Sequence, residues 1–547
     1  MSINTLRDLA LSSIETHSSR VAFSMLNGES VTYREFGERM KSVQTLLENS
    51  GLQTGDKVAL LSSNMPNWSV CYFAVVSLGM VAVPILPDFT GDELDMIIAH
   101  SEAKALLVSD KLFTRLSKTT INSLNVVIRT KSLNVISQKV SAKSNFSEPV
   151  STDLAVIIYT SGTTSKPKGV MLTHYSLVQQ IGVCDSLFKV TKDDVYLSVL
   201  PLSHTYEASL GMLLPFAKGG SVVYLDRLPT ATVLMPALRK VRPTVMLIVP
   251  LLIEKIYRSQ VQAKFNSTAL WRTATKISFV RNYLYRVAGK RLVKVFGGRV
   301  RFLGIGGAKL DVQAEEFLNI AKFPYAIGYG LTETAPVLAG AVPGKTRVGS
   351  TGFIAEAIQI RIENVNPETQ QGEVVVKTPC IMNGYYKNEE ATREVFTKDG
   401  WFRTGDLGFI DKEGFIYIKG RLKNMILGPS GENIYPEDIE TVLNSHVFIT
   451  DSVVTEQEGR LVALVQFDTN AIEAQFQEWK QSFRESIGER LDGWDERKNA
   501  ILKDIKDYVN SKVNRFSRVS EVVEEKEEFE RTPTQKIKRF VYNNRKK

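Results

Sequence analysis

A short segment rich in glycine, hydroxyl groups and lysine carries the clearest chemical signal in this sequence. Residues 159–169 read Tyr-Thr-Ser-Gly-Thr-Thr-Ser-Lys-Pro-Lys-Gly and directly follow the apolar residues 155–158. Small residues let backbone N–H groups approach phosphate oxygens, while hydroxyls and lysines add donors and positive charge. A loop of this composition directly behind a buried strand predicts a phosphate-binding site, with a solvated surface loop as the alternative.

The elements that would position this loop are strands and helices in alternation. Over the first three hundred residues, apolar strand-like runs are separated by helical stretches, which is the pattern of α/β sheets covered by helices. The clearest strand-like runs are residues 105–108, 155–159, 221–225 and 244–249.

One apolar stretch could be mistaken for a transmembrane helix, because residues 58–87 are thirty consecutive uncharged residues. Asparagine and proline interrupt it near both ends, and such residues favour turns. We therefore predict a buried strand–helix–strand unit, with a strand at 58–62, a helix at 66–79 and a strand at 81–86.

The residue pattern of the sequence changes twice in its second half. Residues 347–418 contain short strand-like runs broken by Gly, Pro and Asn, which predicts a small β-rich subdomain. After residue 420 the charge density rises and long helical patterns appear at 471–487 and 494–510. We therefore expect an N-terminal domain at residues 1–420 and a separate C-terminal domain at residues 421–547.

Composition excludes several classes of protein. The chain has 547 residues, of which 43% are apolar, so it is neither disordered nor collagen-like. Its three cysteines lie more than a hundred residues apart, which excludes a disulfide framework and a Cys-x-x-Cys metal site and fits a reducing compartment. The first twenty residues contain no signal-peptide apolar run, so we expect a cytoplasmic protein.

The net charge of +9 comes from one part of the chain, residues 255–310, which we call the basic block. It holds thirteen lysines and arginines and no aspartate or glutamate. Part of it has helical periodicity. The apolar residues of that face are Ile277, Val280, Leu284 and Val287, and the basic residues around it are Arg281, Arg286, Lys290 and Arg291.

Such a block could meet nucleic acid, an anionic membrane or the phosphates of a small molecule. No nucleic-acid-binding motif accompanies the charge, so we expect no nucleic-acid partner. Three interpretations of this block stay open: a solvated surface helix, a contact with the phosphates of coenzyme A, and peripheral contact with an anionic inner-membrane surface. The sequence gives no oligomeric state.

Together with the loop, several further motifs in order along nearly the whole chain resemble the acyl-adenylate-forming superfamily of acyl-CoA synthetases, peptide-synthetase adenylation domains and luciferases. Residues 329–334 read Tyr-Gly-Leu-Thr-Glu-Thr, and residues 401–406 read Trp-Phe-Arg-Thr-Gly-Asp. The other motifs are residues 201–207, 306–308, 372–374, 384–386, 420–423 and 532–539.

The resemblance implies an α/β fold. It would have a large N-terminal domain of two α/β subdomains plus the small β-rich subdomain, followed by a smaller, mobile α+β C-terminal domain. It also implies ATP and Mg²⁺ as cofactors, with coenzyme A as co-substrate. Tyr329 would stack on adenine, and Asp406 and Arg421 would contact the ribose. The implied nucleotide-binding residues are Thr160, Ser161, Gly162, Thr163, Thr164, Lys168, Gly306, Gly307, Ala308, Tyr329, Gly330, Asp406 and Arg421.

The catalytic residues implied by the resemblance are cations and oriented donors more than acids or bases, because negative charge builds up on phosphoryl oxygens. Glu333 would bind Mg²⁺, and Thr332 would contact the α-phosphate. Lys536 would contact the α-phosphate and the carboxylate as negative charge moves between them, because lysine is a point charge on a flexible stem. His204 would line the carboxylate pocket as a gate, and the role of Glu207, in Mg²⁺ support or in an ion pair, stays open.

Transfer to coenzyme A requires a second arrangement of the same site. By resemblance, the C-terminal domain would rotate about a hinge at Lys423. Gly428, Ser430 and Gly431 would then line the tunnel for the thiol.

The expected activity is that of an AMP-forming long-chain fatty-acid–CoA ligase. A fatty acid and ATP would give an acyl-adenylate and pyrophosphate, and coenzyme A would then give acyl-CoA and AMP. Residues 254–257, Glu-Lys-Ile-Tyr, and the Thr-Pro-Thr at 532–534 carry the long-chain resemblance. The alternatives are a ligase for aryl or short- and medium-chain acids, acyl transfer to a carrier protein, and a basic membrane- or nucleic-acid-binding protein.

Overall fold

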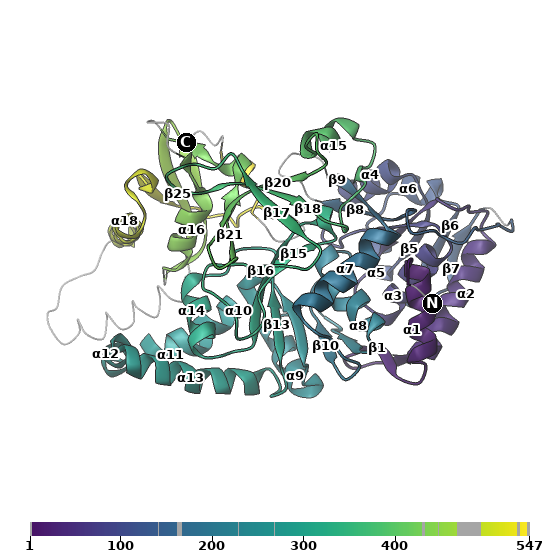
Figure 1. Cartoon of the computed structure of the whole chain (residues 1–547), viewed down its shortest axis with the longest axis horizontal. Coiled ribbons are helices and arrows are strands. Elements are labelled where there is room, and N and C mark those ends of the chain that lie inside the picture. The colour runs from purple at the N-terminus through teal and green to yellow at the C-terminus, as the bar shows by residue number, and fades with distance from the viewer. Residues whose placement is uncertain are drawn as a thin grey trace.

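The chain is described from a computed structural model (Figure 1). The described residues are 3–139, 142–160, 167–227, 229–266, 268–428, 433–446, 448–467, 494–532 and 537–543. Within these ranges, no helix combines the length and the apolar character needed to cross a lipid bilayer.

An eight-stranded sheet carries the base of the predicted phosphate loop. Its strand order is β19-β9-β8-β4-β3-β5-β6-β7, with β8 and β9 antiparallel on either side of the loop. The predicted strand–helix–strand unit is confirmed by β3 (Lys57–Leu61), α3 (Pro66–Ser77) and β4 (Val81–Pro84), and α3 is buried on all sides. The other strands are β5 (Ala103–Val108), β6 (Val126–Arg129), β7 (Val135–Gln138), β8 (Leu154–Thr160), β9 (Lys168–Thr173) and β19 (Gly384–Tyr385).

A nine-stranded sheet positions the remaining motifs of the first domain. Its order is β16-β15-β14-β13-β12-β10-β11-β1-β2, and β11, β10, β12, β13 and β14 run parallel. Motifs that follow parallel strands come to one edge of the sheet, because the carboxyl ends of those strands lie together. The strands are β1 (Val21–Met25), β2 (Ser30–Thr32), β10 (Val195–Ser198), β11 (Ser221–Tyr224), β12 (Val245–Ile248), β13 (Phe302–Ile305), β14 (Tyr325–Gly330), β15 (Val337–Gly340) and β16 (Phe353–Ile354).

Helices pack against both sheets, and one large hydrophobic core joins them (Figure 1). Leu60 and Val156 of the eight-stranded sheet belong to the same core as Tyr196 and Val245 of the nine-stranded sheet. The two sheets therefore form one body, as expected for two α/β subdomains. The helices of this part are α1 (Leu6–Thr16), α2 (Tyr33–Glu48), α4 (Gly91–Ser101), α5 (Asp110–Phe113), α6 (Lys118–Ser123), α7 (His174–Leu187), α8 (Leu214–Ala217), α9 (Ala231–Val241) and α14 (Val312–Ile320).

The basic block is mostly helical. One of its helices leaves part of the predicted apolar face exposed. In α13 (Ser278–Val295) it is Gly289 and Leu292 that are buried. The predicted apolar face instead leaves Ile277 57% exposed and Val287 36% exposed. The other helices of the block, and the helix before it, are α10 (Pro250–Tyr257), α11 (Ala263–Asn266) and α12 (Ala269–Lys276).

The predicted β-rich subdomain is an antiparallel sheet of order β17-β18-β20-β21. The short helix α15 (Glu389–Val395) precedes β20 in the chain. The strands are β17 (Gln359–Glu363), β18 (Gly372–Lys377), β20 (Phe402–Ile410) and β21 (Ile416–Arg421).

The residues after β21 form their own small sheet and their own core, at the upper left in Figure 1. The predicted helix at 494–510 is α18 (Trp494–Lys512), whereas the predicted helix at 471–487 lies outside the described residues. The core unites strands and helices, Val454, Ile439 and Ile505 among them. The elements are β22 (Ile426–Leu427), β23 (Asn433–Ile434), α16 (Pro436–Asn444), β24 (Ile449–Gln457), β25 (Arg460–Phe467), α18 and β26 (Glu521–Glu524).

Candidate active site

The base of the predicted phosphate loop is a closed β-hairpin. Thr160, the last residue of β8, is the register partner of Lys168, the first residue of β9. The Thr160 hydroxyl donates to the Lys168 carbonyl at 3.4 Å. Both residues are therefore held at the mouth of the loop, while Ser161, Gly162, Thr163 and Thr164 lie outside the described residues.

Three predicted nucleoside-binding residues are joined directly. The Tyr329 hydroxyl donates to Asp406 Oδ2 at 2.7 Å, and Arg421 Nε lies 2.8 Å from Asp406 Oδ1. Asp406 and Arg421 are cross-strand partners in β20 and β21, which fixes the pair. Burial, followed by the negative charge of Asp406, raises the pKa of Tyr329, so its phenol stays a proton donor.

This arrangement leaves Asp406 suited to a sugar. Tyr329 and Arg421 contact the two carboxylate oxygens of Asp406 and orient an acceptor-only group. Asp406 is buried, only 4% exposed, so its charge is held in place by Arg421 and Tyr329. A negatively charged acceptor of this kind is compatible with the hydroxyl groups of a ribose, and the ribose contact of Asp406 and Arg421 stays a prediction.

The predicted metal ligand lies next to the predicted phosphate lysine. Glu333 stands in a 3₁₀ turn (Thr332–Thr334) directly after β14, and Glu333 Oε1 accepts a hydrogen bond of 2.9 Å from the Tyr385 hydroxyl. The Lys168 ammonium group lies 4.9 Å from the centre of the Tyr385 ring. Tyr385 thus connects a carboxylate to a cation, a combination that fits a Mg²⁺ ion bound through one carboxylate and phosphate oxygens.

Tyr385 was not among the individually predicted site residues, although it lies within the motif at 384–386. It reaches the site because β19 pairs with β9 and makes Tyr385 the register partner of Val170. Burial, followed by the charge of Glu333, raises the pKa of the Tyr385 phenol. The motif was the available signal, but its contact with Glu333 depends on strand pairing across the fold.

The turn that carries Thr332 and Glu333 requires glycine at its start. A Cβ atom at Gly330 would come within 1.8 Å of the Pro336 carbonyl oxygen. The same turn brings Thr332 against the predicted acyl-site motif, since the Thr205 hydroxyl donates to the Thr332 hydroxyl at 3.2 Å. Thr205 is a second contact residue that was not singled out from the sequence.

His204 and Tyr206 connect the acyl-site motif to the glycines after β13. The backbone N–H of Tyr206 donates to His204 Nδ1 at 3.2 Å, which assigns the ring proton of a neutral His204 to Nε2. A Cβ atom at Gly306 would lie 3.2 Å from Tyr206 Cζ, so the Tyr206 ring packs on the backbone there. Gly307 follows with a φ of +89°, and Ala308 is exposed on the same loop.

Glu207 occupies the protein core rather than an open site. It is 1% exposed, and its Oε2 has no hydrogen-bond partner among the described residues. It starts a π-helical segment, η1 (Glu207–Leu213), and its carboxyl group lies against Gly211, where a Cβ atom would be 2.6 Å away. Burial raises the pKa of Glu207 to about 8, with a hydrogen bond from Ser198 acting in the opposite direction.

The predicted residues of the second half-reaction are described only in part. Lys423 is exposed in a 3₁₀ turn (Leu422–Asn424) between β21 and β22. Gly428 is buried at the end of β22. Ser430, Gly431 and Lys536 lie outside the described residues, so their predicted roles stay predictions.

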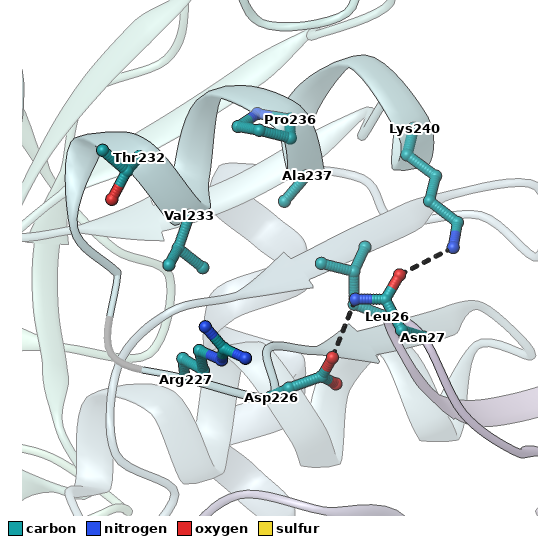
Figure 2. A pocket seen from close by; sticks show the side chains of 9 residues that line it. All are labelled: Leu26, Asn27, Asp226, Arg227, Thr232, Val233, Pro236, Ala237 and Lys240. Atoms are coloured by element: carbon teal, nitrogen blue, oxygen red, sulfur yellow. Dashed lines mark hydrogen bonds between the residues drawn. The ribbon is translucent and has the colours of Figure 1, made fainter.

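A cavity of about 230 Å³ against α9 contains none of these residues. Figure 2 shows Asn27 at its edge, hydrogen-bonded to Asp226 at 2.8 Å and to Lys240 at 2.9 Å. Val233 and Ala237 of α9 form its apolar side. The volume is below the 300–1,000 Å³ usual for ligand pockets, and we assign it no substrate.

The described residues come from three sheets and form a nucleoside group and a phosphate group, with Tyr329 and Glu333 both near the carboxyl end of β14. The nucleoside group is Tyr329, Asp406 and Arg421, and the phosphate group is Thr160, Lys168, Glu333 and Tyr385. Such a set can orient a nucleoside triphosphate and stabilise charge that develops on its phosphoryl oxygens.

Comparison with known sequences finds a matching family model and curated relatives. Residues 12–386 match the family described as AMP-binding enzyme. Long chain acyl-CoA synthetase 6, peroxisomal, of Arabidopsis thaliana is 30% identical over 496 residues, which are 81% of this chain and 69% of the relative. Long-chain-fatty-acid–CoA ligase FadD15 of Mycobacterium bovis is 29% identical over 495 residues, which are 84% of this chain and 80% of the relative.

Solved structures with the same fold include two enzymes with bound adenosine nucleotides. o-Succinylbenzoate CoA synthetase from Bacillus subtilis, in complex with its acyl-adenylate intermediate, has a TM-score of 0.77 and 21% identity, covering 98% of both chains. ATP-bound MatB from Rhodopseudomonas palustris has a TM-score of 0.76 and 22% identity, covering 99% of this chain and 98% of that one. At this identity the similarity establishes the fold.

Proposed function

Because this chain belongs to the AMP-binding enzyme family, we propose that it is an adenylate-forming ligase that joins a long-chain fatty acid to coenzyme A. The observation that carries the proposal is that Tyr329 and Glu333, four residues apart at the end of β14 and in the turn after it, each contact one of the two groups. Tyr329 bonds to Asp406 on one side, and Tyr385 bonds to Glu333 beside Lys168 on the other.

In the first half-reaction, a carboxylate oxygen of the fatty acid attacks the α-phosphorus of ATP. The bond from that phosphorus to the oxygen bridging the α- and β-phosphates breaks, and pyrophosphate leaves. Asp406 and Arg421 hold the ribose, while Thr160 and Lys168 hold the outer phosphates. Magnesium, held by Glu333 and phosphate oxygens, supplies positive charge to the triphosphate when bound.

Thr332 and His204 act at the end of the nucleotide that meets the acid. The contact between Thr205 and Thr332 ties the acyl-site motif to the turn that carries Glu333. His204, whose Nδ1 accepts from the backbone N–H of Tyr206, lines the path of the carboxylate as a gate. Lys536 follows the negative charge as it passes from the carboxylate to the α-phosphate.

In the second half-reaction, the thiol of coenzyme A attacks the acyl carbon, and AMP leaves with the electron pair of the broken carbon–oxygen bond. Residues 421–547 form the domain that rotates between the two steps, and Lys423 is its hinge. The separate core of that part, formed by residues such as Ile439, Val454 and Ile505, supports movement as a unit. Gly428, Ser430 and Gly431 line the thiol tunnel.

The proposal of a long-chain substrate rests on similarity to curated relatives and on short sequence motifs. The relatives named above are described as long-chain enzymes, at 29–30% identity. Chain-length discrimination is small per methylene, about 1–3 kcal/mol, so related enzymes with different chain preferences can share a fold. A ligase for aryl or shorter acids, or one that passes the acyl group to a carrier protein, would use the same nucleotide site.

The deciding experiment is ATP–pyrophosphate exchange with acids graded from acetate to stearate, together with benzoate. We expect exchange without coenzyme A to be fastest with the longest acids, and AMP release to require coenzyme A. A maximum with benzoate or with short acids would contradict the long-chain substrate. AMP release that depends on a carrier protein instead of coenzyme A would contradict the acceptor.

A further inference from the structure

The outer surface of α13 exposes large apolar side chains. Phe279 is 82% exposed and Tyr283 is 63% exposed, beside Ile277 at 57%. Soluble proteins scatter exposed apolar residues singly, whereas neighbouring ones mark an interaction surface. Figure 1 shows α12 and α13 along the lower left edge of the molecule, next to the core of the first domain.

Helical geometry turns Phe279 and Tyr283 away from the buried side of α13, whereas Ile277 is the residue before the helix. Successive residues advance by about 100°, so Gly289 and Leu292 mark one face and point to the protein. The opposite face, which we call the outer face of α13, combines apolar and basic side chains. Its members are Phe279, Tyr283, Arg286, Val287, Lys290 and Lys294.

The charges of this face come from Arg286, Lys290 and Lys294. Within the described part of the chain, no ion pair involves Arg286, Lys290 or Lys294, and all three are exposed. The basic block contains no acidic residue over its whole length, which adds to the positive charge of this helix. An anionic partner would complement this surface.

We propose that the outer face of α13 docks the protein on an anionic lipid bilayer. A helix that lies in the membrane interface carries lysines and arginines with aromatic and aliphatic residues able to enter the headgroup region. Aromatic rings such as Tyr283 are favoured at that depth. Val287, 36% exposed on this face, matches hydrocarbon and offers nothing to a nucleic-acid base, which favours lipid over RNA.

Vesicle co-sedimentation tests the charges. The full chain is mixed with vesicles of phosphatidylcholine alone, or with about 30% phosphatidylglycerol, at low and high salt. Each basic residue near an anionic surface is worth about fivefold in partitioning, so Arg286→Glu, Lys290→Glu and Lys294→Glu together should lower binding at least about 100-fold. Raising the salt should weaken binding of the wild type, because exposed charges are screened.

A matched control reverses three exposed lysines elsewhere, with Lys41→Glu, Lys118→Glu and Lys398→Glu. It changes the net charge equally and should lower binding far less. If both triple variants lose binding equally, net charge alone drives the association and the proposed face is wrong.

Fluorescence tests insertion of the aromatic side chains. All three native cysteines are buried, so Phe279→Cys can be labelled selectively with an environment-sensitive maleimide. We expect a blue-shifted, brighter emission on anionic vesicles and quenching by spin-labelled lipid. The same label at Phe516→Cys, where the phenylalanine is 52% exposed in the C-terminal part, should report no change.

The removal of the rings gives an independent measure. Phe279→Ser with Tyr283→Ser should lower binding to anionic vesicles roughly tenfold while retaining the same salt dependence. Unchanged binding by both the ring and the charge variants would overturn the proposal. The proposal would also be overturned if the wild type did not bind vesicles but bound RNA in a salt-sensitive way, or formed a dimer, and the variants abolished that RNA binding or that dimer. None of these measurements uses ATP or a fatty acid, so they stand apart from the proposed function.

Discussion

Tyr385 lies between the two charged groups that a nucleoside triphosphate would meet. Its hydroxyl donates to Glu333, and its ring faces the Lys168 ammonium group. The hydrogen bond orients a carboxylate, and the ring contact holds a cation at the mouth of the loop. One tyrosine therefore prepares both charges before any ligand is bound.

Replacing Tyr385 by phenylalanine separates these two contacts. The ring remains for Lys168, whereas Glu333 loses its donor and with it the orientation needed for Mg²⁺. A hydrogen bond to a charged group contributes about 1.5–3 kcal/mol, and we expect about 1 kcal/mol here because the Glu333 side chain is partly exposed. The KM for ATP, measured in pyrophosphate exchange at limiting Mg²⁺, should rise about fivefold.

Tyr386→Phe is the matched control, because the Tyr386 hydroxyl donates to Glu102, away from Glu333. It should leave the KM for ATP and the Mg²⁺ dependence unchanged. Equal effects of the two variants would show that the hydroxyl of Tyr385 has no special role.

Glu207 makes the stability of the protein depend on pH. Its folded pKa of about 8 lies above its ordinary value of 4.5, mainly because of burial. The folded state therefore binds the proton more tightly than the unfolded state. The stabilisation is fully present below pH 4.5 and is lost as the pH rises through 8.

Glu207→Gln keeps the shape of the protonated side chain and removes its titration. We expect the variant to match the wild type at pH 5 and to unfold at a higher temperature at pH 9. The difference in unfolding free energy has an upper bound of about 5 kcal/mol. Thermal unfolding from pH 5 to pH 9 measures it, with the exposed Glu390→Gln as a control. Parallel profiles for wild type and Glu207→Gln would contradict the assignment.

At the scale of single elements, the sequence predicts best what its contiguous residues determine. The apolar run at β8 and the unit of β3, α3 and β4 could be recognised because every residue that defines them is local. Residues 347–418 likewise predict the β-rich sheet, because their turn residues and short strand-like runs are local. Asp406 and Arg421 could be predicted as site residues from their motifs. Their contact with each other could not, because it depends on the register between β20 and β21.

Contacts between distant elements could not be predicted in this way. Tyr385 meets Glu333 because β19 pairs with β9, more than two hundred residues earlier in the chain, and no local pattern encodes that partner. The exposure of α13 is a similar case. Its periodic apolar residues predict a face, but the packing of Gly289, where a Cβ atom would lie 2.7 Å from Ala321, decides which side is buried. Tertiary packing overrides the pattern at that helix.

At the scale of the whole molecule, the basic block also holds the C-terminal part in position. Arg258, in the segment after α10, donates to the Ile449 carbonyl at 3.1 Å and to the Asn444 carbonyl. Lys309 pairs with Asp438 at 2.8 Å, but both side chains are exposed, so this pair contributes little. Among the described residues, Arg258 is thus a stronger polar tie than Lys309, and it joins the segment after α10 to residues at the end of α16 and the start of β24.

This tie should matter if the C-terminal part changes orientation between the two half-reactions. Arg258→Ala removes two charge-assisted hydrogen bonds that exist in one orientation, which we expect to shift the balance of orientations by about 1–2 kcal/mol. The two half-reactions should then respond unequally, with the ratio of their rates changing about 5- to 30-fold. Pyrophosphate exchange measures adenylate formation, and single-turnover transfer from a preformed acyl-adenylate to coenzyme A measures thioester formation. Arg239→Ala, an exposed position on α9, should change neither rate. Equal slowing of both steps by Arg258→Ala, at an unchanged unfolding temperature, would mean that this contact does not select an orientation.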